Sequence, residues 1–453
     1  MVPLPRRGRS ITATMTDHLR PHDAALARLQ ALHPKKIDLS LGRMRRLCAA
    51  LGDPQRSLPP VIHVSGTNGK GSTVAFLRAM AEAASLKVHV FTSPHLVRFV
   101  ERIRLAGTLI TEDHLAEVLE RVEAANAGEP ITFFEITTAA AFLAFSEVPA
   151  DLCLLEVGLG GSLDATNVID PPALSVICPV DHDHREFLGD AIASIAGEKA
   201  GIIKLGRPVL TGWQTQEAFE VIEARAEALG SPLLAMGRDF DAYAQGGRMV
   251  LQAPDQLLDL PLPALTGAHQ IANAGLAAMA ALTLDHPKLS ADAVASGIET
   301  VTWPARMQRL TAGPLAARAA AAGTDLWLDG GHNVHAARAL ADALQALKGR
   351  DGRSVTLICG LLANKDAQGF FDALRATGAR VLAVPFQSDA ASPPERLVSA
   401  ARAAGLEAEA AADLDGALDR ALAGEGPPPR LLICGSLYLA GEVLARSPDT
   451  WPV

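Results

Sequence analysis

The sequence predicts an α/β protein of two domains, each organised around a mostly parallel sheet. The chain has 453 residues, more than one hydrophobic core ordinarily serves. In its second half, short apolar runs alternate with helix-like stretches, an order that gives parallel strands joined by right-handed crossovers. In its first half, an apolar run passes through a glycine-rich turn into a helix-like segment.

Composition narrows the class of protein. Hydrophobic residues make up 49% and charged residues 20%, the balance of a well-packed soluble protein. The net charge of −9 argues against nucleic-acid binding, and no apolar run has membrane-spanning length. No apolar core of a secretory signal follows the first arginines, so we expect a cytoplasmic protein. The scattered cysteines are expected to be buried free thiols: Cys48, Cys153, Cys178, Cys359 and Cys434.

A phosphate-binding loop is predicted where the apolar run 61–65 meets the turn GTNGKGS and a helix expected over 75–84. Glycines let backbone N–H groups close on phosphate oxygens, the helix N-terminus adds a favourable dipole, and Lys70 adds a charge. A hydroxyl just after the lysine suits Mg²⁺. The spacing departs from the common G-x-x-x-x-G-K-[ST], because Val64 stands where the first glycine belongs and Gly71 follows Lys70. A glycine-rich surface turn is the alternative; the flanking strand, helix and lysine favour phosphate.

Polar residues follow three further apolar runs. The run 87–91 ends in Thr92-Ser93-Pro94, the run 151–155 ends in Glu156 before three glycines, and the run 174–178 leads to the segment DHDH at 181–184. Ligands of open parallel sheets bind beyond the carboxyl ends of the strands, where a carboxylate suits Mg²⁺. The DHDH segment mimics a zinc site, but no further His or Cys lies near it at ligand spacing, so zinc is not favoured.

The remaining elements follow from hydrophobic periodicity and from breaks at Gly and Pro. In the first half, helices are expected over 18–32, 44–51, 112–125, 136–145 and 268–284, with Phe133-Phe134 between two of them, while 215–260 is uninformative. In the second half, strands are expected over 325–329, 354–359, 380–384 and 430–434, with helices over 334–347, 368–376, 394–404, 413–423 and 437–444. There is no G-x-G-x-x-G, so a dinucleotide site has little support.

Taken in order, these motifs resemble the folylpolyglutamate synthase/dihydrofolate synthase family of the Mur-ligase superfamily. The pieces that carry the likeness are GTNGKGS at 66–72, TSPHL at 92–96, EVGLGG at 156–161, DATN at 164–167, EKAG at 198–201 and DGGHN at 329–333. The resemblance implies an N-terminal P-loop ATPase domain with a parallel-sheet core and a smaller C-terminal Rossmann-like α/β domain. The expected division is a loose tail over 1–18, an ATP-binding domain over 19–298, a linker over 299–306 and a ligase domain over 307–453.

The resemblance also implies roles for particular residues. ATP would be held by Thr67, Asn68, Gly69, Lys70, Gly71, Ser72, Asn273, Arg306, Asp329 and His332. Mg²⁺ would be bound by Ser93, Glu156 and His184, and a second Mg²⁺ by Lys199 after carboxylation of its amine. Lys70, His184 and Lys199 would be the catalytic residues. The pterin substrate would contact Ile37, Asp38, Phe133, Phe134 and Asp164.

By this resemblance the chain is expected to be a monomeric, ATP-dependent ligase for small molecules. It would add L-glutamate to dihydropteroate and to reduced folates through an acyl phosphate. Three alternatives stay open. The chain has only one of these activities, or it adds an amino acid to a UDP-linked cell-wall precursor, or it is a nucleotide-dependent regulatory module without ligase chemistry. A regulatory module without ligase chemistry would not explain why candidate metal ligands follow three separate strands.

Overall fold

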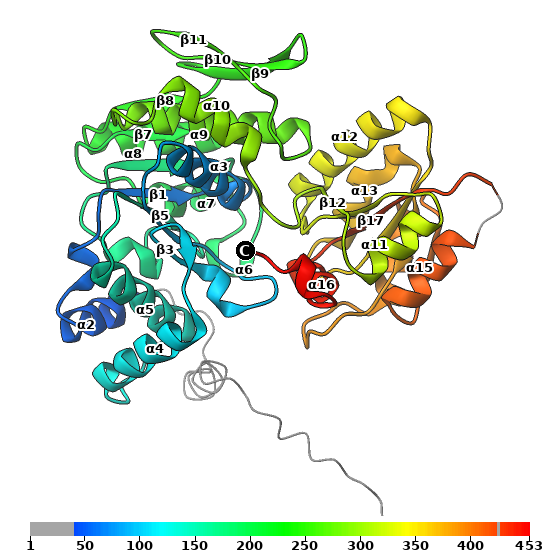
Figure 1. Ribbon diagram of the computed structural model, residues 1–453, viewed down its shortest axis with the longest axis horizontal. Coiled ribbons are helices and arrows are strands. Elements are labelled where there is room, and N and C mark those ends of the chain that lie inside the picture. Colours follow the sequence, from blue (N-terminus) through cyan, green and yellow to red (C-terminus); the bar gives the residue numbers. More distant parts are fainter. Residues whose placement is uncertain (1–39, 424–425) are drawn as a thin grey trace, which may run out of the picture.

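The computed structural model describes residues 40–423 and 426–453. Figure 1 shows two bodies side by side, the first coloured blue to green and the second yellow to red. Each has its own sheet, of eight strands in the first and six in the second. The predicted tail, the helix expected over 18–32, and Ile37 and Asp38 lie outside the described residues.

The first sheet has the strand order β4-β3-β2-β5-β1-β6-β7-β8. Neighbours from β2 to β8 are parallel, and β3 and β4 add an antiparallel edge. The central strands β1 and β5 are buried along their whole lengths, as expected for apolar runs covered on both faces. The strands are β1 (Val61–Ser65), β2 (Val88–Phe91), β3 (Ile103–Leu105), β4 (Thr108–Leu109), β5 (Leu152–Glu156), β6 (Leu174–Ile177), β7 (Val209–Thr211) and β8 (Leu233–Ala235).

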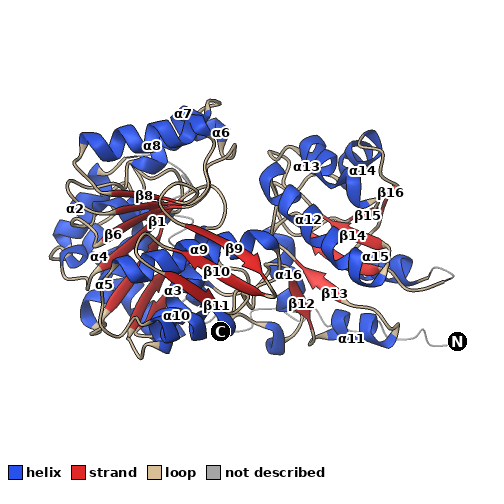
Figure 2. Ribbon diagram, turned by 90° about the horizontal axis from the view of Figure 1, so that it is seen from above, coloured by secondary structure: helices blue, strands red, loops and turns tan. Residues whose placement is uncertain are grey.

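Helices cover both faces of this sheet, as Figure 2 shows. One face packs against α3 (Lys70–Ala83), α9 (Ala268–Thr283) and α10 (Ala291–Thr300). The other packs against α2 (Gly42–Ala50), α4 (Glu112–Asn126), α5 (Phe133–Glu147), α7 (Ile192–Ala200) and α8 (Gln216–Ala228). The short helices are α6 (Arg185–Leu188), η1 (Pro54–Arg56), η2 (Phe99–Arg102) and η3 (Ala165–Val168). Since α3 runs between the sheet and the other two helices, its residues 71–81 are all buried.

A small antiparallel sheet stands apart from the main one, at the top of Figure 1. It has the order β11-β10-β9, with β9 (Asp241–Gln245), β10 (Arg248–Gln252) and β11 (Leu257–Leu260). It lies against α9, where a side chain at Gly275 would come within 2.2 Å of Ala242. The sequence had left 215–260 without an assignment, and this region holds α8, β8 and these three strands.

The second sheet has the order β12-β13-β17-β14-β15-β16, parallel except for β12. Its strands are β12 (Gln308–Leu310), β13 (Leu326–Leu328), β14 (Val355–Cys359), β15 (Arg380–Ala383), β16 (Ala408–Ala410) and β17 (Arg430–Cys434). One face packs against α12 (Val334–Asp351), α13 (Ala367–Leu374) and α14 (Pro394–Ala403). The other packs against α11 (Pro314–Ala321), α15 (Leu414–Leu422) and α16 (Leu437–Ala445), and η4 (Arg375–Thr377) and η5 (Pro448–Thr450) complete this body.

The predicted α/β class is therefore confirmed, and so is the alternation in the second half. Two helix starts were predicted wrongly. The helix after the glycine-rich turn begins at Lys70, five residues before the expected start, because Gly69 is its N-cap and Gly71 belongs to its first turn. Phe133 and Phe134 do not lie between helices but open α5, where Thr132 and Glu135 form a capping box. All five cysteines are buried and free, as predicted. Among the described residues, no helix has the length and apolar character needed to cross a membrane.

Candidate active site

The glycine-rich turn joins the buried strand β1 to the helix α3 and keeps Lys70 close to the loop's own backbone. Gly66 has φ of +140°, and a Cβ there would lie 2.6 Å from that of Cys178, so only glycine fits. The ammonium of Lys70 donates to the carbonyl oxygens of Gly66 at 3.0 Å and Thr67 at 3.3 Å. The lysine therefore points over the loop where a phosphate would sit.

The neighbouring strands β2, β5, β1 and β6 bring the predicted polar residues to one edge of the sheet. The Glu156 side chain, at the end of β5, is buried and accepts a hydrogen bond from the backbone N–H of Ser93 at 3.3 Å. Burial raises the pKa of the Glu156 carboxyl, and the nearby charge of Lys70 opposes that shift. Within residues 40–423 and 426–453 the Glu156 carboxylate forms no ion pair, which favours binding of a cation beside the loop.

His184 and Lys199 face the same space in unusual protonation states. Burial lowers the pKa of His184 to about 4 against the opposing charge of Asp183, so its imidazole is neutral at pH 7, the form that binds metals. Burial and then the charge of Lys70 lower the pKa of Lys199 to about 7. The Lys199 amine donates to the Gly66 carbonyl oxygen at 2.9 Å. The lowered pKa therefore favours the uncharged amine more than in an ordinary lysine.

The second body supplies the opposite wall. Asp329 follows β13, and its carboxylate accepts from the N–H groups of Met307 at 2.7 Å and Gly331 at 2.6 Å. These bonds fix the turn that carries His332. From the first body, the amide oxygen of Asn273 on α9 lies so close to Gly69 that a Cβ there would stand 2.6 Å from it. The loop, α9 and the turn after β13 thus meet around one space.

That space is a cavity of about 360 Å³, here called the phosphate cavity. It brings together every residue for which ATP or metal binding was predicted: Thr67, Asn68, Gly69, Lys70, Gly71, Ser72, Ser93, Glu156, His184, Lys199, Asn273, Arg306, Asp329 and His332. Phe133, Phe134 and Asp164 do not line it. Asp164 is instead bound to the N–H groups of Gly158 and Leu159, and Phe134 packs on Gly158. Asp164 and Phe134 therefore shape the turn after Glu156, whereas the Phe133 ring packs edge-on against Phe99.

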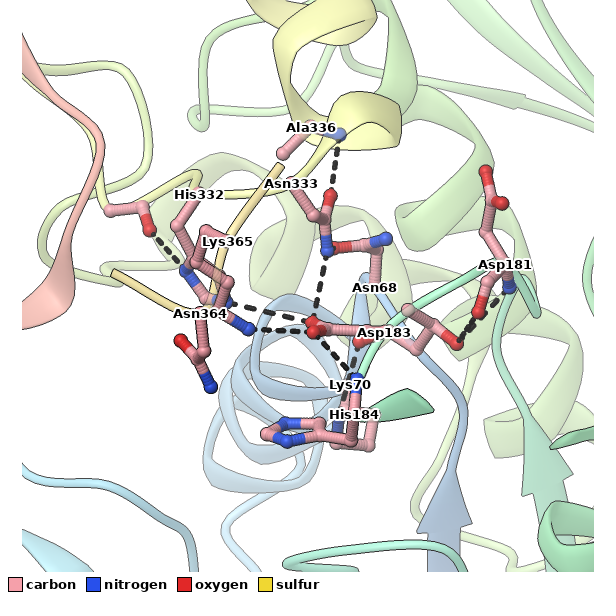
Figure 3. Close-up of polar contacts among 12 residues, drawn as sticks. Asn68, Lys70, Asp181, Asp183, His184, His332, Asn333, Ala336, Asn364 and Lys365 are labelled. Carbon is pink, nitrogen blue, oxygen red and sulfur yellow. Dashed lines mark hydrogen bonds and ion pairs between the residues drawn. The ribbon is translucent and has the colours of Figure 1, made fainter. Parts of the chain in front are cut away.

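A polar cluster that the sequence analysis did not predict joins the two bodies. Figure 3 shows Asp183 at its centre, with side chains of the second body around it. The Asp183 carboxylate accepts from Lys365 at 2.6 Å and from Asn333 at 3.2 Å, and lies 3.6 Å from the His332 imidazole. Burial opposes its ionisation, but the hydrogen bond and charge of His332 and the charges of Lys365 and His184 hold the pKa of Asp183 below its usual value. Lys365 lies in the segment between β14 and α13, and nothing in the sequence around it marked it as part of a site.

The donor set fits a hard divalent cation. The Ser93 hydroxyl, the Glu156 carboxylate and the neutral His184 imidazole line one cavity, and oxygen donors with one nitrogen suit Mg²⁺ or Mn²⁺. Next to Lys199, the Glu198 carboxylate has a buried oxygen without a hydrogen-bond partner, which also suits a cation nearby. No cluster of three or more His, Cys, Asp or Glu residues with metal-site geometry occurs within residues 40–423 and 426–453.

Comparison with known proteins shows the family of this chain. Residues 306–437 match the family model described as Mur ligase, glutamate ligase domain. Over 423 residues, the chain is 33% identical to the dihydrofolate synthase/folylpolyglutamate synthase of Bacillus subtilis, covering 90% of this chain and 94% of that protein. The chain belongs to the dihydrofolate synthase/folylpolyglutamate synthase family.

Solved structures of the family have the same fold. E. coli FolC in complex with DHPP and ADP is 31% identical, with a TM-score of 0.84 over 94% of this chain and 97% of that one. The bifunctional folylpolyglutamate synthase/dihydrofolate synthase of Yersinia pestis, complexed with AMPPNP and Mn ion, is 30% identical, with a TM-score of 0.83 over 94% and 98%. Both family structures hold an adenine nucleotide, and the second also holds a divalent metal.

Proposed function

We propose that the chain is an ATP-dependent ligase that adds L-glutamate to dihydropteroate, forming dihydrofolate, and to reduced folates, forming polyglutamates. The observation that carries this proposal is the phosphate cavity. A glycine-rich loop with its lysine, a buried carboxylate and a neutral imidazole from the first body face Arg306, Asp329 and His332 at its other wall. Family membership and the glutamate ligase domain over 306–437 support the same reaction class.

The proposed reaction has two steps. The acceptor carboxylate attacks the γ-phosphate of ATP, giving an acyl phosphate and ADP, and the amine of glutamate then displaces phosphate to form the amide. The loop N–H groups and Lys70 hold the phosphates and offset the charge on the transferred group. Positioning by the two bodies supplies much of the rate, because two anions have to meet in line. Closure of the second body excludes water from the acyl phosphate.

Ser93, Glu156 and His184 would hold a Mg²⁺ ion, and Lys199 would serve a second one. The ions would supply charge neutralisation between the nucleotide and the acceptor carboxylate. We propose that Lys199 is carboxylated: its uncharged amine attacks CO₂ and loses a proton, which turns a cation into an anion. The lowered pKa of Lys199 supports this step, because only the neutral amine reacts. Asn273, Arg306, Asp329 and His332 would contact the nucleotide.

The pterin is proposed to bind beside the turn after Glu156. Phe134 and Asp164 shape that turn, Phe133 precedes Phe134 at the start of α5, and Ile37 and Asp38 would complete the site; the last two lie outside the described residues. We further propose a monomeric, cytoplasmic enzyme with an ATP-binding domain over 19–298, a linker over 299–306 and a ligase domain over 307–453. Two bodies that enclose one cavity need no second subunit to complete it.

The test is phosphate release from ATP with Mg²⁺ and L-glutamate, comparing dihydropteroate with tetrahydrofolate as acceptor. Turnover with both acceptors is the expected result, and turnover with one alone would restrict the substrate. A UDP-linked peptide precursor that stimulates turnover in place of either pterin would overturn the proposal.

A variant ties this activity to the phosphate cavity. Lys70→Ala is expected to lower kcat by about 10³-fold or more, because the charge nearest the phosphates is lost. The matched control is Lys87→Ala, at an exposed site before β2. Far-UV circular dichroism of both variants checks the fold, and full activity in Lys70→Ala would exclude the assigned site.

A further inference from the structure

A second, larger cavity adjoins the phosphate cavity, and neither the sequence motifs nor the reaction above assigns it a role. Its volume is about 620 Å³, and it lies between α3, β2, the segment 301–312 and the segment 449–453. We call it the arginine cavity, because Arg78, Arg104, Arg306 and Arg309 line it. Gly71, Ser93, Glu156 and Arg306 line both cavities. A molecule whose one end lies at the reaction centre can therefore extend into the arginine cavity.

Arg78 and Arg104 place two positive charges close together there. Arg78 lies on α3, and the residue is 9% exposed. Its Nη2 donates to the main-chain oxygen and the hydroxyl of Thr302 at 3.4 and 3.5 Å, its Nε has no hydrogen-bond partner, and the Glu82 carboxylate lies 3.9 Å from that Nε. Arg104 donates to the main-chain oxygens of Gly107 and Val453, both at 2.8 Å, and to no side-chain carboxylate. Burial, and then the charge of Arg78, lower the pKa of Arg104 to about 10. Two guanidinium groups that repel each other in a cavity attract an anion between them.

The acidic side chains that line the arginine cavity are directed elsewhere, and the nearby negative charge acting on Arg78 and Arg104 is that of Glu82, outside the lining, which opposes the lowering of both guanidinium pKa values by burial. Glu101 accepts from three backbone N–H groups, those of Leu96, Val97 and Arg98, at 2.6 to 2.9 Å. Glu156 faces the reaction centre, and Asp449 lies at the other end, near Ser447. Arg309 is bound to Asp325 at 2.5 Å, outside the cavity lining. Arg306 also lines the phosphate cavity, where it is proposed to contact the nucleotide, so Arg78 and Arg104 are the cations of the arginine cavity that we consider for a further carboxylate.

We propose that the arginine cavity binds the α-carboxylates of γ-glutamyl units already attached to the acceptor, with Arg78 and Arg104 as their partners. This deepens the proposed function and rests on it. The γ-carboxylate that reacts lies at the shared wall of Ser93 and Glu156, and the pterin at the opposite end of the molecule lies beside the turn after Glu156. The glutamyl units between these two ends would loop past Gly71 to the two arginines. Dihydropteroate carries no glutamyl unit and makes no use of these contacts. The main-chain oxygen of Val453 now accepts from Arg104, and a carboxylate exchanging with it keeps that hydrogen bond.

The test measures kcat/KM for a tetrahydrofolate triglutamate relative to that for dihydropteroate. In Arg104→Gln and Arg78→Met, this ratio is expected to fall about tenfold or more, the effect of one charged hydrogen bond. Arg309→Gln is the matched control: it removes a charge from the same cavity that Asp325 already neutralises, and its ratio is expected to stay at the wild-type value. A ratio within twofold of wild type in both test variants would overturn the proposal. Because Arg78 is buried, Arg78→Lys and the melting temperature of each variant separate lost binding from lost folding.

Two further arms distinguish the source of the carboxylates. In the first, the KM for L-glutamate is measured in Arg104→Gln and Arg78→Met with dihydropteroate as acceptor. If that KM rises while the kcat/KM ratio of the two acceptors stays at the wild-type value, the cavity binds the incoming amino acid and the proposal fails. Calorimetry with γ-linked triglutamate, a peptide without a pterin, is expected to show about tenfold weaker binding in Arg104→Gln. Equal binding in both proteins would contradict the proposal. If wild-type enzyme turns over no pterin acceptor, the proposed function fails, and this arm still reports on the cavity.

Discussion

The carboxylate of Asp183 lies 2.6 Å from the ammonium of Lys365, across 182 residues of sequence. Both side chains are about nine-tenths buried, at 11% and 9% exposure. Asp183 directly precedes His184 in the first body, and Lys365 follows β14 in the second. The pair therefore holds the ligase half of the protein next to the loop that carries a proposed metal ligand.

Lys365→Met is expected to lower kcat/KM about 10- to 100-fold, because it leaves a buried carboxylate without its main partner, at a cost of about 3–5 kcal/mol to the docked arrangement. The double variant Asp183→Asn/Lys365→Met should be less impaired than Lys365→Met alone, since no unpaired charge remains. Steady-state kinetics and small-angle scattering of the three proteins measure the effect. Equal activity of Lys365→Met and wild type would show that the ion pair does not set the domain arrangement.

Gly441 on α16 touches the first body so closely that a side chain cannot fit. A Cβ there would lie 2.2 Å from the carbonyl oxygen of Leu96, three residues after Ser93. Gly441→Ala is expected to cost about 1–3 kcal/mol of docking and to lower turnover, because the loop has to move. Gly349→Ala, on α12 with open space around it, is the control and should stabilise the protein by about 0.5–1 kcal/mol. Melting temperature and turnover are measured for both variants. Wild-type values in Gly441→Ala would show that the loop carrying Leu96 moves aside at no cost.

His63, inside β1, predicts a pH dependence of stability. Its Nε2 contacts the Thr166 hydroxyl at 2.8 Å, that hydroxyl donates to Asp164, and Nδ1 is buried without a partner. Burial, and then the charge of Lys204, lower the pKa of His63 to about 3. In the unfolded chain this imidazole takes up a proton near pH 6.5, whereas in the folded chain it stays neutral until about pH 3. The free energy of unfolding therefore has its full value above pH 6.5 and decreases as the pH falls from 6.5 toward 3.

Between pH 7 and pH 5 this single group should remove about 2 kcal/mol from the free energy of unfolding. His63→Gln keeps a donor for Thr166 but does not titrate, so its loss over the same interval should be smaller by that amount. Urea unfolding at the two pH values measures both proteins. If wild type and His63→Gln lose the same free energy of unfolding between pH 7 and pH 5, other groups cause the pH dependence.

Lys199 predicts a dependence on CO₂. Because its pKa is lowered to about 7, the reactive neutral amine gains population as pH rises through 7 and loses it below. Enzyme stripped of CO₂ should regain activity on addition of bicarbonate, faster at pH 8 than at pH 6. Carbon-13 NMR with labelled bicarbonate should show a carbamate signal in wild type and none in Lys199→Gln. Recovery without any bicarbonate would contradict a role for carboxylation.

Much of the site was readable in the sequence because the strands are parallel. Ser93, Glu156 and His184 all come just after apolar runs, and parallel strands bring such positions to one edge of a sheet. The pairing of β2, β5, β1 and β6 does so here. A clear hydrophobic period also predicted most strands and helices of the second half, where buried strands such as β14 and β17 alternate with amphipathic helices.

What the sequence did not indicate depends on contacts distant in the chain. No local sequence pattern marks Lys365, because its role depends on its ion pair with Asp183 in the other body. The strands β9 to β11 are short and partly exposed, with polar residues on both sides, so no apolar period marks them. The contact of Asp164 with the pterin stays a prediction, and what the sequence did not indicate is that its carboxylate also holds the turn at Gly158 and Leu159. A carboxylate that caps a backbone turn and one that binds a ligand look alike in sequence.

Gly71, Ser93, Glu156 and Arg306 form a common boundary of two adjacent cavities. For inhibitor design, this means that one compound can extend from the phosphate cavity into the arginine cavity. A phosphate mimic tethered to a short chain of carboxylates would bind its second half as an intramolecular event, at a high effective concentration. Because Arg78 and Arg104 lie outside the phosphate-binding loop, such a compound would discriminate this ligase from ATPases that share the loop alone.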